Sequence, residues 1–283
     1  MTSFARRLVP TLGLAAVAML ATAAAAGAGK GGPSPGVEFA GRGIANTSET
    51  ARYVARPNGS STTVTAYDAD GRLRRGTMRG VFGIPLVAFD GTLGGLSHDG
   101  RSLVLASPRT VGGKTWFTTL STTTMRPTRT IGLRGTWSYD ALSPDGRTLY
   151  LVEHSPTVSY RVRAYDVARG RLLKEAVIDP RLGGRAMTGM PVTRATGPGG
   201  VWEYTLYQKP EGVPFVHALD TVRGKALCIE LPWRGDQSRL FLVRMRVEGR
   251  KLVLTRTSGA EVATIDTRAF AVHSHANPLR AGS

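Results

Sequence analysis

The sequence predicts an all-β fold built from about five similar units of four antiparallel strands. Three observations support this: short alternating apolar and polar runs from residue 37 onward, two near copies of one turn-and-strand segment, and further copies at regular intervals. The two near copies are LSHDGRSLVLA, which begins at Leu96, and LSPDGRTLYLV, which begins at Leu142.

A marker residue at the end of one strand in each unit sets the period. The markers are spaced 45 to 54 residues apart and are Asp68, Ser121, Asp166, Asp220 and Asp266. Four strands in a repeat of that length are typical of a propeller blade, which buries its faces only by stacking on other blades. We therefore predict a β-propeller of about five four-stranded blades, closed or incomplete, over residues 37–283.

Each unit is expected to start with an innermost strand, followed by a tight turn and a second strand. Asp-Gly suits such a turn because glycine accepts a positive φ. The predicted innermost strands are Glu38–Ala45, Gly91–Ser97, Trp137–Ser143, Pro191–Gly197 and Leu240–Arg246. The predicted second strands are Ser102–Ser107, Thr148–His154, Trp202–Gln208 and Lys251–Thr257. The fourth strand of the last unit, Ala271–Pro278, is weak, so ring closure stays open at this stage.

The segments SPDGRTLYLV and AYDVARGRLL, at 143–152 and 164–173, resemble secreted bacterial β-propellers with WD-like and YVTN-type repeats. The resemblance covers residues 37–272. The YVTN tetrapeptide itself is absent, and so are the Trp-Asp and Gly-His pairs of true WD repeats. The resemblance therefore implies the blade and no particular activity.

The N-terminus predicts export. Residues 1–26 have two arginines, Arg6 and Arg7, before an apolar run and a stretch of small residues, which is the pattern of a cleaved signal peptide. A retained membrane anchor is the alternative. Residues 27–36 are a Gly/Pro linker, and the mature protein is expected to be secreted or extracytoplasmic. Cys228 is the only cysteine, so no intrachain disulfide can form.

The charge balance favours an anionic or a protein partner. The net charge is +17, with 37 Lys and Arg against 20 Asp and Glu. The arginines are scattered, without a basic run or interleaved aromatic residues, so nucleic-acid binding is not predicted. We expect a protein or an anionic envelope polymer as partner, and peripheral membrane contact or a homodimer through an open propeller edge as alternatives.

Polar residues on the predicted innermost strands are candidates for a ligand site at the mouth of the axial channel. They are Asp140, Thr193, Arg194, Arg244 and Arg246. Arginine binds anions with two parallel hydrogen bonds, so an anionic ligand would suit them. The alternative is that Asp140 and the arginines pair with one another across neighbouring blades.

Catalytic motifs are not recognisable in the sequence. A metal-dependent hydrolase similar to lactonase-type propellers would need a channel cage for a divalent cation such as Ca²⁺ or Mg²⁺. Its candidate ligands are Glu153, His154, Glu203 and His217, which fall on second and third strands without a common inward direction. We therefore predict a non-catalytic binding or scaffold module without a cofactor. The hydrolase and a structural assembly protein remain the alternatives.

Overall fold

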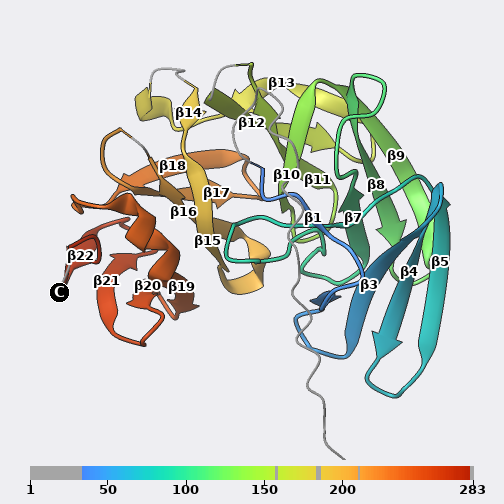
Figure 1. The fold of residues 1–283 in the computed structure, drawn as a ribbon, viewed down its shortest axis with the longest axis horizontal. Coiled ribbons are helices and arrows are strands. Elements are labelled where there is room, and N and C mark those ends of the chain that lie inside the picture. Colours follow the sequence, from blue (N-terminus) through green and yellow to red (C-terminus); the bar gives the residue numbers. More distant parts are fainter. Residues whose placement is uncertain (1–33, 157–158, 183–185, 210, 281–283) are drawn as a thin grey trace, which may run out of the picture.

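The computed structural model describes residues 34–156, 159–182, 186–209 and 211–280, and strands dominate it (Figure 1). The predicted signal peptide, 1–26, lies outside the described residues, as does most of the predicted linker. The all-β prediction is confirmed, since the described helices are three short 3-10 turns: η1 Pro180–Leu182, η2 Pro198–Gly200 and η3 Gln237–Leu242.

Five antiparallel sheets follow one another along the chain, and we call them blades 1 to 5. Blade 1 contains β2 Ile44–Ala45, β3 Ala51–Asn58, β4 Ser61–Asp68 and β5 Leu73–Arg79. Blade 2 contains β7 Ser102–Ala106, β8 Lys114–Ser121 and β9 Arg126–Arg134. Blade 3 contains β10 Thr136–Leu142, β11 Thr148–His154, β12 Ser159–Asp166, β13 Arg171–Val177 and the added β14 Met187–Thr188.

Blade 4 contains β15 Met190–Thr196, β16 Trp202–Gln208, β17 Phe215–Asp220 and β18 Lys225–Glu230. Blade 5 contains β19 Val243–Glu248, β20 Lys251–Arg256, β21 Glu261–Asp266 and β22 Val272–Ser274. A separate pair, β1 Val37–Glu38 and β6 Ile84–Pro85, lies beside blade 2. All four predicted second strands are confirmed to within one residue.

Three predicted innermost strands are wrong in part. Gly91–Ser97 is an irregular segment, because Gly91 and Gly95 have φ of +87° and +102°, where a strand cannot continue. Leu240–Arg246 starts inside η3, whose first turn is fixed by the Asp236 carboxylate accepting from the Ser238 N–H at 3.0 Å. Of Glu38–Ala45 only Ile44 and Ala45 pair in blade 1.

The turn after the innermost strand is built identically in blades 2 and 3. In blade 3 the Ser143 hydroxyl donates to Asp145 at 2.7 Å and accepts from the Thr148 N–H at 2.9 Å. Asp145 also accepts from the Arg147 N–H at 3.1 Å. The corresponding residues of blade 2, Ser97, Asp99, Arg101 and Ser102, form the same bonds. The repeated Ser-x-Asp-Gly-Arg segment is thus a hydrogen-bonded turn.

Four buried apolar clusters join the blades in chain order, one between each consecutive pair. Leu103 contributes to the cluster of blades 1 and 2, and Leu149 to that of blades 2 and 3. Leu219 contributes to the cluster of blades 3 and 4, and Leu254 to that of blades 4 and 5. Among the described residues no cluster joins blade 5 to blade 1.

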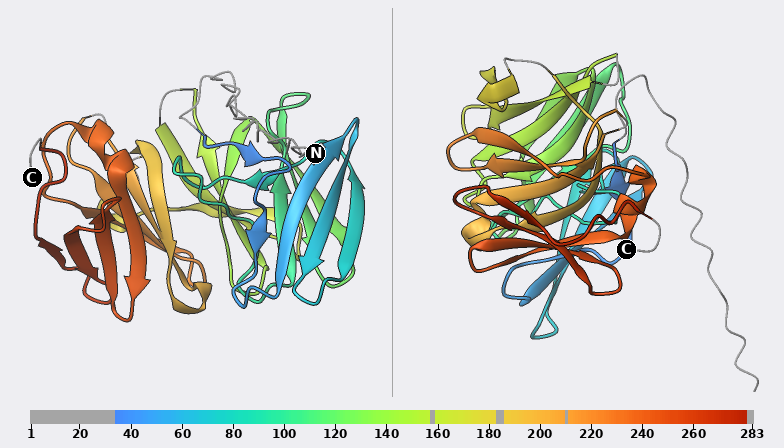
Figure 2. Two further views of the ribbon diagram at one scale, coloured as in Figure 1. Left: turned by 60° about the horizontal axis from the view of Figure 1, so that its bottom comes forward. Right: turned by 90° about the vertical axis from the view of Figure 1, so that its left-hand side faces the viewer.

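The blades therefore form an arc with two free ends. Figure 1 shows blade 5, in red, and blade 1, in blue, on opposite sides of the open part of the arc. The two ends also lie apart in the left view of Figure 2, where the open side comes forward. Each end blade packs on one neighbour, whereas blades 2, 3 and 4 pack on two.

Candidate binding surfaces

The segment between β6 and β7 runs through the middle of the arc (Figure 1). The Phe89 N–H donates to the Pro191 carbonyl at 3.0 Å, and the Asp90 N–H donates to the Val192 carbonyl at 3.1 Å. These bonds tie blade 2 to the innermost strand of blade 4. The Ser-x-Asp-Gly turns of blades 2 and 3 also contact each other, because the Asp99 N–H donates to the Pro144 carbonyl at 3.1 Å. The place of the predicted channel is thus occupied by the chain itself.

Asp140 and Arg194 form a buried ion pair between blades 3 and 4. Their side chains are 2% and 5% exposed. The Arg194 guanidinium donates to the carboxylate and to the backbone carbonyl of Asp140, and its Nε donates to the Thr205 hydroxyl at 2.8 Å. Burial alone would lower the pKa of Arg194, but the charge of Asp140 raises it overall. The guanidinium of Arg194 is thus paired with a carboxylate of the neighbouring blade.

A small cavity of about 20 Å³ adjoins this pair, lined by Ser138, Asp140, His154 and Tyr207 among others. The Asp140 Oδ2 atom is buried without a hydrogen-bond partner in the described structure. A space of this size accepts about one water molecule and no organic ligand. Ser138 Oγ lies 2.8 Å from His154 Nε2, but His154 Nδ1 has no described partner that would orient the ring as in a catalytic triad.

The remaining predicted channel residues lie elsewhere. Thr193 is buried opposite Leu206, on the side of blade 4 that packs against blade 5. Arg244 and Arg246 are exposed on the face of blade 5 that is turned away from blade 4. The structure therefore does not bring these five residues together at one site. Thr193 and Arg194 are neighbours on β15 and point to opposite faces of blade 4, and Arg244 and Arg246 lie on the far face of blade 5.

The four candidate metal ligands do not converge. Glu153 forms an ion pair with Arg163 at 3.0 Å, and Glu203 accepts from the Thr196 hydroxyl at 2.9 Å. His154 bonds Ser138, and His217 is buried beside Cys228. Burial raises the pKa of Glu203 to about 7 and lowers that of His217. Within the described residues no group of three or more His, Cys, Asp and Glu side chains is arranged to hold a metal ion.

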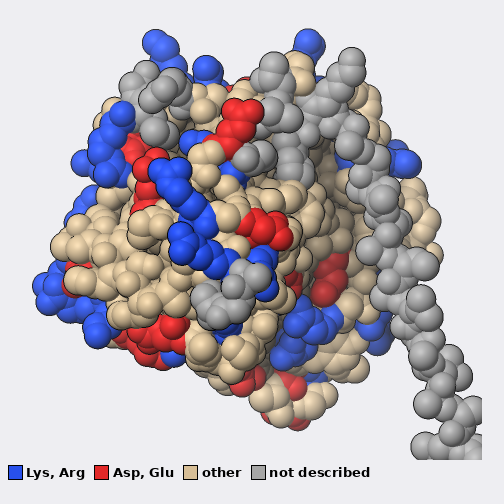
Figure 3. All heavy atoms as spheres, turned by 60° about the vertical axis from the view of Figure 1, so that its left-hand side comes forward, with Lys and Arg blue, Asp and Glu red and all other residues tan. Residues whose placement is uncertain are grey.

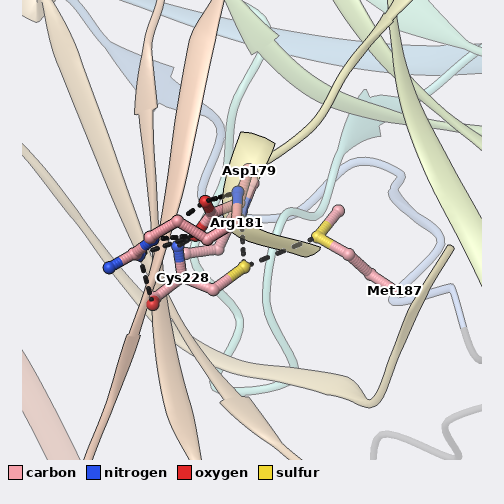
Figure 4. Close-up of polar contacts among 5 residues, drawn as sticks. Asp179, Arg181, Met187 and Cys228 are labelled. Carbon is pink, nitrogen blue, oxygen red and sulfur yellow. Dashed lines mark hydrogen bonds and ion pairs between the residues drawn. The ribbon is translucent and has the colours of Figure 1, made fainter. Parts of the chain in front are cut away.

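A larger groove of about 720 Å³ runs along β18, between η1 and the last turn of blade 5. Asp179 accepts from the Cys228 N–H at 2.8 Å, and Arg181 donates to the Cys228 carbonyl at 2.9 Å (Figure 4). Burial opposes the ionisation of Asp179, but hydrogen bonds from Arg181 and Cys228 lower its pKa to about 2. The side chains of Asp179 and Arg181 thus occupy the free edge of β18 at Cys228 and protect this edge from pairing with another strand.

The two end faces of the arc each gather several of the basic residues that are scattered in the sequence. The face of blade 1 turned away from blade 2 holds four exposed arginines, Arg52, Arg56, Arg75 and Arg79, and no Asp or Glu. The corresponding face of blade 5 is mixed. By register it carries Arg244, Arg246 and Lys251 together with Glu248, Glu261 and Asp266. Figure 3 shows the side with blades 4 and 5, where basic and acidic side chains are interspersed.

The sequence contained a signal for the blade 1 face. Residues two or four apart on a strand share one face, and Arg52 and Arg56 are four apart, as are Arg75 and Arg79. The register then places both pairs on the same face, which the sequence could not settle.

Comparison with known proteins supports the fold. No protein-family model matches the chain, and no curated protein does. The hydrazine synthase of Kuenenia stuttgartiensis is similar over 88% of this chain and 68% of its own, with 13% identity and a TM-score of 0.50. The Dos1 propeller matches at 12% identity and a TM-score of 0.46, over 82% of this chain and 57% of its own. The β-propeller domain of Cps50 (Swd1) from Myceliophteria thermophila matches at 13% identity and a TM-score of 0.46, over 88% of this chain and 70% of its own.

The likeness to the hydrazine synthase concerns the fold alone, because the identity is low. The chain spans 57% to 70% of the lengths of these three proteins. It is a β-propeller protein, and its blades are joined in an arc. No helix among the described residues is long and apolar enough to cross a membrane.

Proposed function

We propose that the chain is an exported β-propeller that binds an anionic partner outside the cytoplasm and catalyses no reaction. The observation that supports this most directly is the uncompensated basic charge on the exposed face of blade 1. Its four arginines form no ion pair with any described carboxylate. Export rests on the signal-peptide pattern of residues 1–26.

Many acidic residues of the chain are already bonded in the turns between strands or in a buried ion pair. Asp145, Asp166 and Asp266 accept backbone N–H groups in turns, and Asp140 is buried against Arg194. Carboxylates used in this way hold the blades in shape. The exposed arginines of blade 1 are paired with no described carboxylate, which favours a role for them in recognition.

Retention on a polyanion tests the binding function. We expect the purified chain to be retained on dextran sulfate beads and not on neutral dextran beads. Sodium chloride should release it before about 1 M, where the screening length is about 3 Å. A chain that flows through both matrices at 50 mM salt would refute an anionic partner.

Export is tested by expressing the chain with and without residues 1–26. Only the chain that carries residues 1–26 should appear outside the cytoplasm.

The hydrolase alternative makes a different prediction. Binding of Ca²⁺ or Mg²⁺ at 100 times its dissociation constant would stabilise the fold by about 2.7 kcal/mol and raise the melting temperature by several degrees. We expect melting curves in EDTA and in excess Ca²⁺ or Mg²⁺ to coincide. A clear rise with either ion would replace the binding proposal by the metal-dependent hydrolase.

A further inference from the structure

The four arginines on the free face of blade 1 are regularly spaced on two strands, β3 and β5. Tyr53, Ala55, Val64 and Met78 pack against blade 2, so the alternate residues of the same strands face away from it. In register, Val54 lies opposite Thr65, and Thr65 lies opposite Arg75. Arg75 is therefore level with Val54, halfway between Arg52 and Arg56. Likewise Asn58 lies opposite Ser61, and Ser61 opposite Arg79, so Arg79 is one step beyond Arg56.

The four charges thus alternate between β3 and β5 in the order Arg52, Arg75, Arg56, Arg79. Each step along the strands covers two residues, or about 7 Å, and β3 and β5 lie about 10 Å apart across β4. Thr63 of β4 and Thr77 of β5 lie level with Arg56 and share a hydrogen bond of 3.1 Å, so their hydroxyls add polar groups to the same face. The result is a strip about 20 Å long with one positive charge every 7 Å.

Protection of an end blade does not by itself require this arrangement. A terminal repeat needs a polar outer face for solubility, and mixed charges meet that need. Blade 5 shows this solution, since Arg246 pairs with Glu248 and His275 pairs with Glu261. The free face of blade 1 instead carries one sign of charge only. Its arginines interact with neutral groups: Arg52 donates to the Arg42 carbonyl at 3.2 Å, and Arg56 donates to the Tyr67 hydroxyl at 3.0 Å.

We propose that this arginine strip binds a linear phosphate polymer, whose phosphates are contacted at intervals along its length by Arg52, Arg75, Arg56 and Arg79. The proposal rests on the proposed function and names its surface and ligand class. A guanidinium binds a phosphate with two parallel hydrogen bonds, and a free sheet face leaves room for an extended chain. Tyr67 is the one aromatic residue in these register positions, whereas sheets that read single-stranded nucleic acids stack two or three bases on aromatic side chains. The geometry therefore favours a polymer recognised through phosphate alone.

Long-chain inorganic polyphosphate is the probe that tests this proposal, by titration calorimetry at several salt concentrations. The test variant is R52Q/R56Q/R75Q/R79Q. The matched control is R147Q/R169Q/R223Q/R250Q, which removes the same charge from four exposed arginines that each pair with a turn aspartate. Melting curves check that both variants fold.

We expect the test variant to bind polyphosphate at least tenfold more weakly, and the control to change less than threefold. Each phosphate contact contributes about 0.7 to 0.9 to the slope of log affinity against log salt, so the test variant should lose about 3 from that slope. Equal losses in both variants would overturn the strip and leave the proposed function standing. An unaltered chain that binds dextran sulfate but not polyphosphate would also overturn the strip and leave the proposed function standing.

Two other polymers decide the ligand class. We expect poly-glutamate and oligo-dT to bind more weakly than polyphosphate at the same charge concentration. Equal affinity for poly-glutamate would overturn the choice of phosphate, and tighter binding of oligo-dT would replace it by a single-stranded nucleic acid. If the unaltered chain binds none of the polyanions, dextran sulfate included, both this proposal and the proposed function fail.

Discussion

At the scale of single residues, the structure separates charges that are used for stability from charges that are free. Arg194 and Arg56 are both arginines on strands, yet one is 5% exposed and bonded to Asp140, while the other is exposed and bonded only to a tyrosine hydroxyl. A buried charge must find a partner, and an exposed one need not. Sequence alone identified Asp140 and Arg194 as equivalent positions and left their pairing open, because the register between blades is a long-range property.

Loss of one partner of the buried pair should be costly. Arg194→Met leaves the Asp140 carboxylate buried without a counter-charge, and we expect a loss of about 3–5 kcal/mol in the free energy of unfolding. Urea unfolding at pH 7 measures it. The double variant Asp140→Leu with Arg194→Met removes both charges and should recover at least half of that loss. A double variant as unstable as the single one would show that packing, and not charge, explains the effect.

His154 should make the fold sensitive to acid. Burial lowers its pKa to about 4, below the ordinary value of 6.5, so the unfolded chain binds the proton more readily between these values. Its contribution to stability is therefore present above pH 6.5 and is lost as the pH falls toward 4. Glu203, with a pKa raised to about 7, acts in the opposite direction between pH 4.5 and 7.

The variant His154→Gln tests this, because glutamine can keep a hydrogen bond to Ser138 and does not titrate. We expect its free energy of unfolding, measured by urea at pH 4.5, 5.5 and 6.5, to fall less toward acid than that of the unaltered chain. Parallel curves for the two proteins would show that His154 does not titrate differently in the folded state.

At the scale of elements, the parts governed by local chemistry were predictable and the parts governed by distant contacts were not. The strands that follow a Ser-x-Asp-Gly turn were located to within one residue, since the turn fixes their first residue. The innermost strand of blade 2 was not, because residues 86–96 cross the axis to blade 4, and only the folded chain brings Phe89 to Pro191. A tight turn is readable in sequence, and a contact across about 100 residues is not.

The glycine of the turn should matter more where another blade touches it. Gly146 and Gly249 occupy the same place in blades 3 and 5, with φ of +71° and +57°. A Cβ at Gly146 would lie 2.7 Å from the Cβ of Ser102 in blade 2, whereas a Cβ at Gly249 would meet nothing within 4 Å. Gly249→Ala should cost about 1–2 kcal/mol from backbone strain alone, and Gly146→Ala at least about 1 kcal/mol more. Equal losses in the free energy of unfolding, measured by urea, would mean that the contact with Ser102 does not restrict the turn at Gly146.

At the scale of the whole molecule, the end blades differ from the inner ones in how many neighbours hold them. Four apolar clusters serve five blades, and among the described residues blades 1 and 5 share none. Closing the ring would press the arginine strip of blade 1 against the charged face of blade 5, whose carboxylates Glu248 and Glu261 already have partners. Burying those charges without new partners would cost several kcal/mol per ion. The charge distribution thus favours an open arc, which the repeat pattern alone had left undecided.

Native-state hydrogen exchange can test the open arc directly. Local opening follows the number of packed neighbours, so the central strands of the inner blades, β12 and β17, should exchange only at close to the global unfolding free energy. The central strands of the end blades, β4 and β21, should exchange through openings of clearly lower free energy, because each end blade loses only one interface when it detaches. Peptide-resolved mass spectrometry at low denaturant measures both. In a closed ring every blade has two interfaces, so equal protection of β4, β12, β17 and β21 would show that blades 1 and 5 meet in solution. That result would also remove the arginine strip from the free surface, since the faces it needs would be packed together.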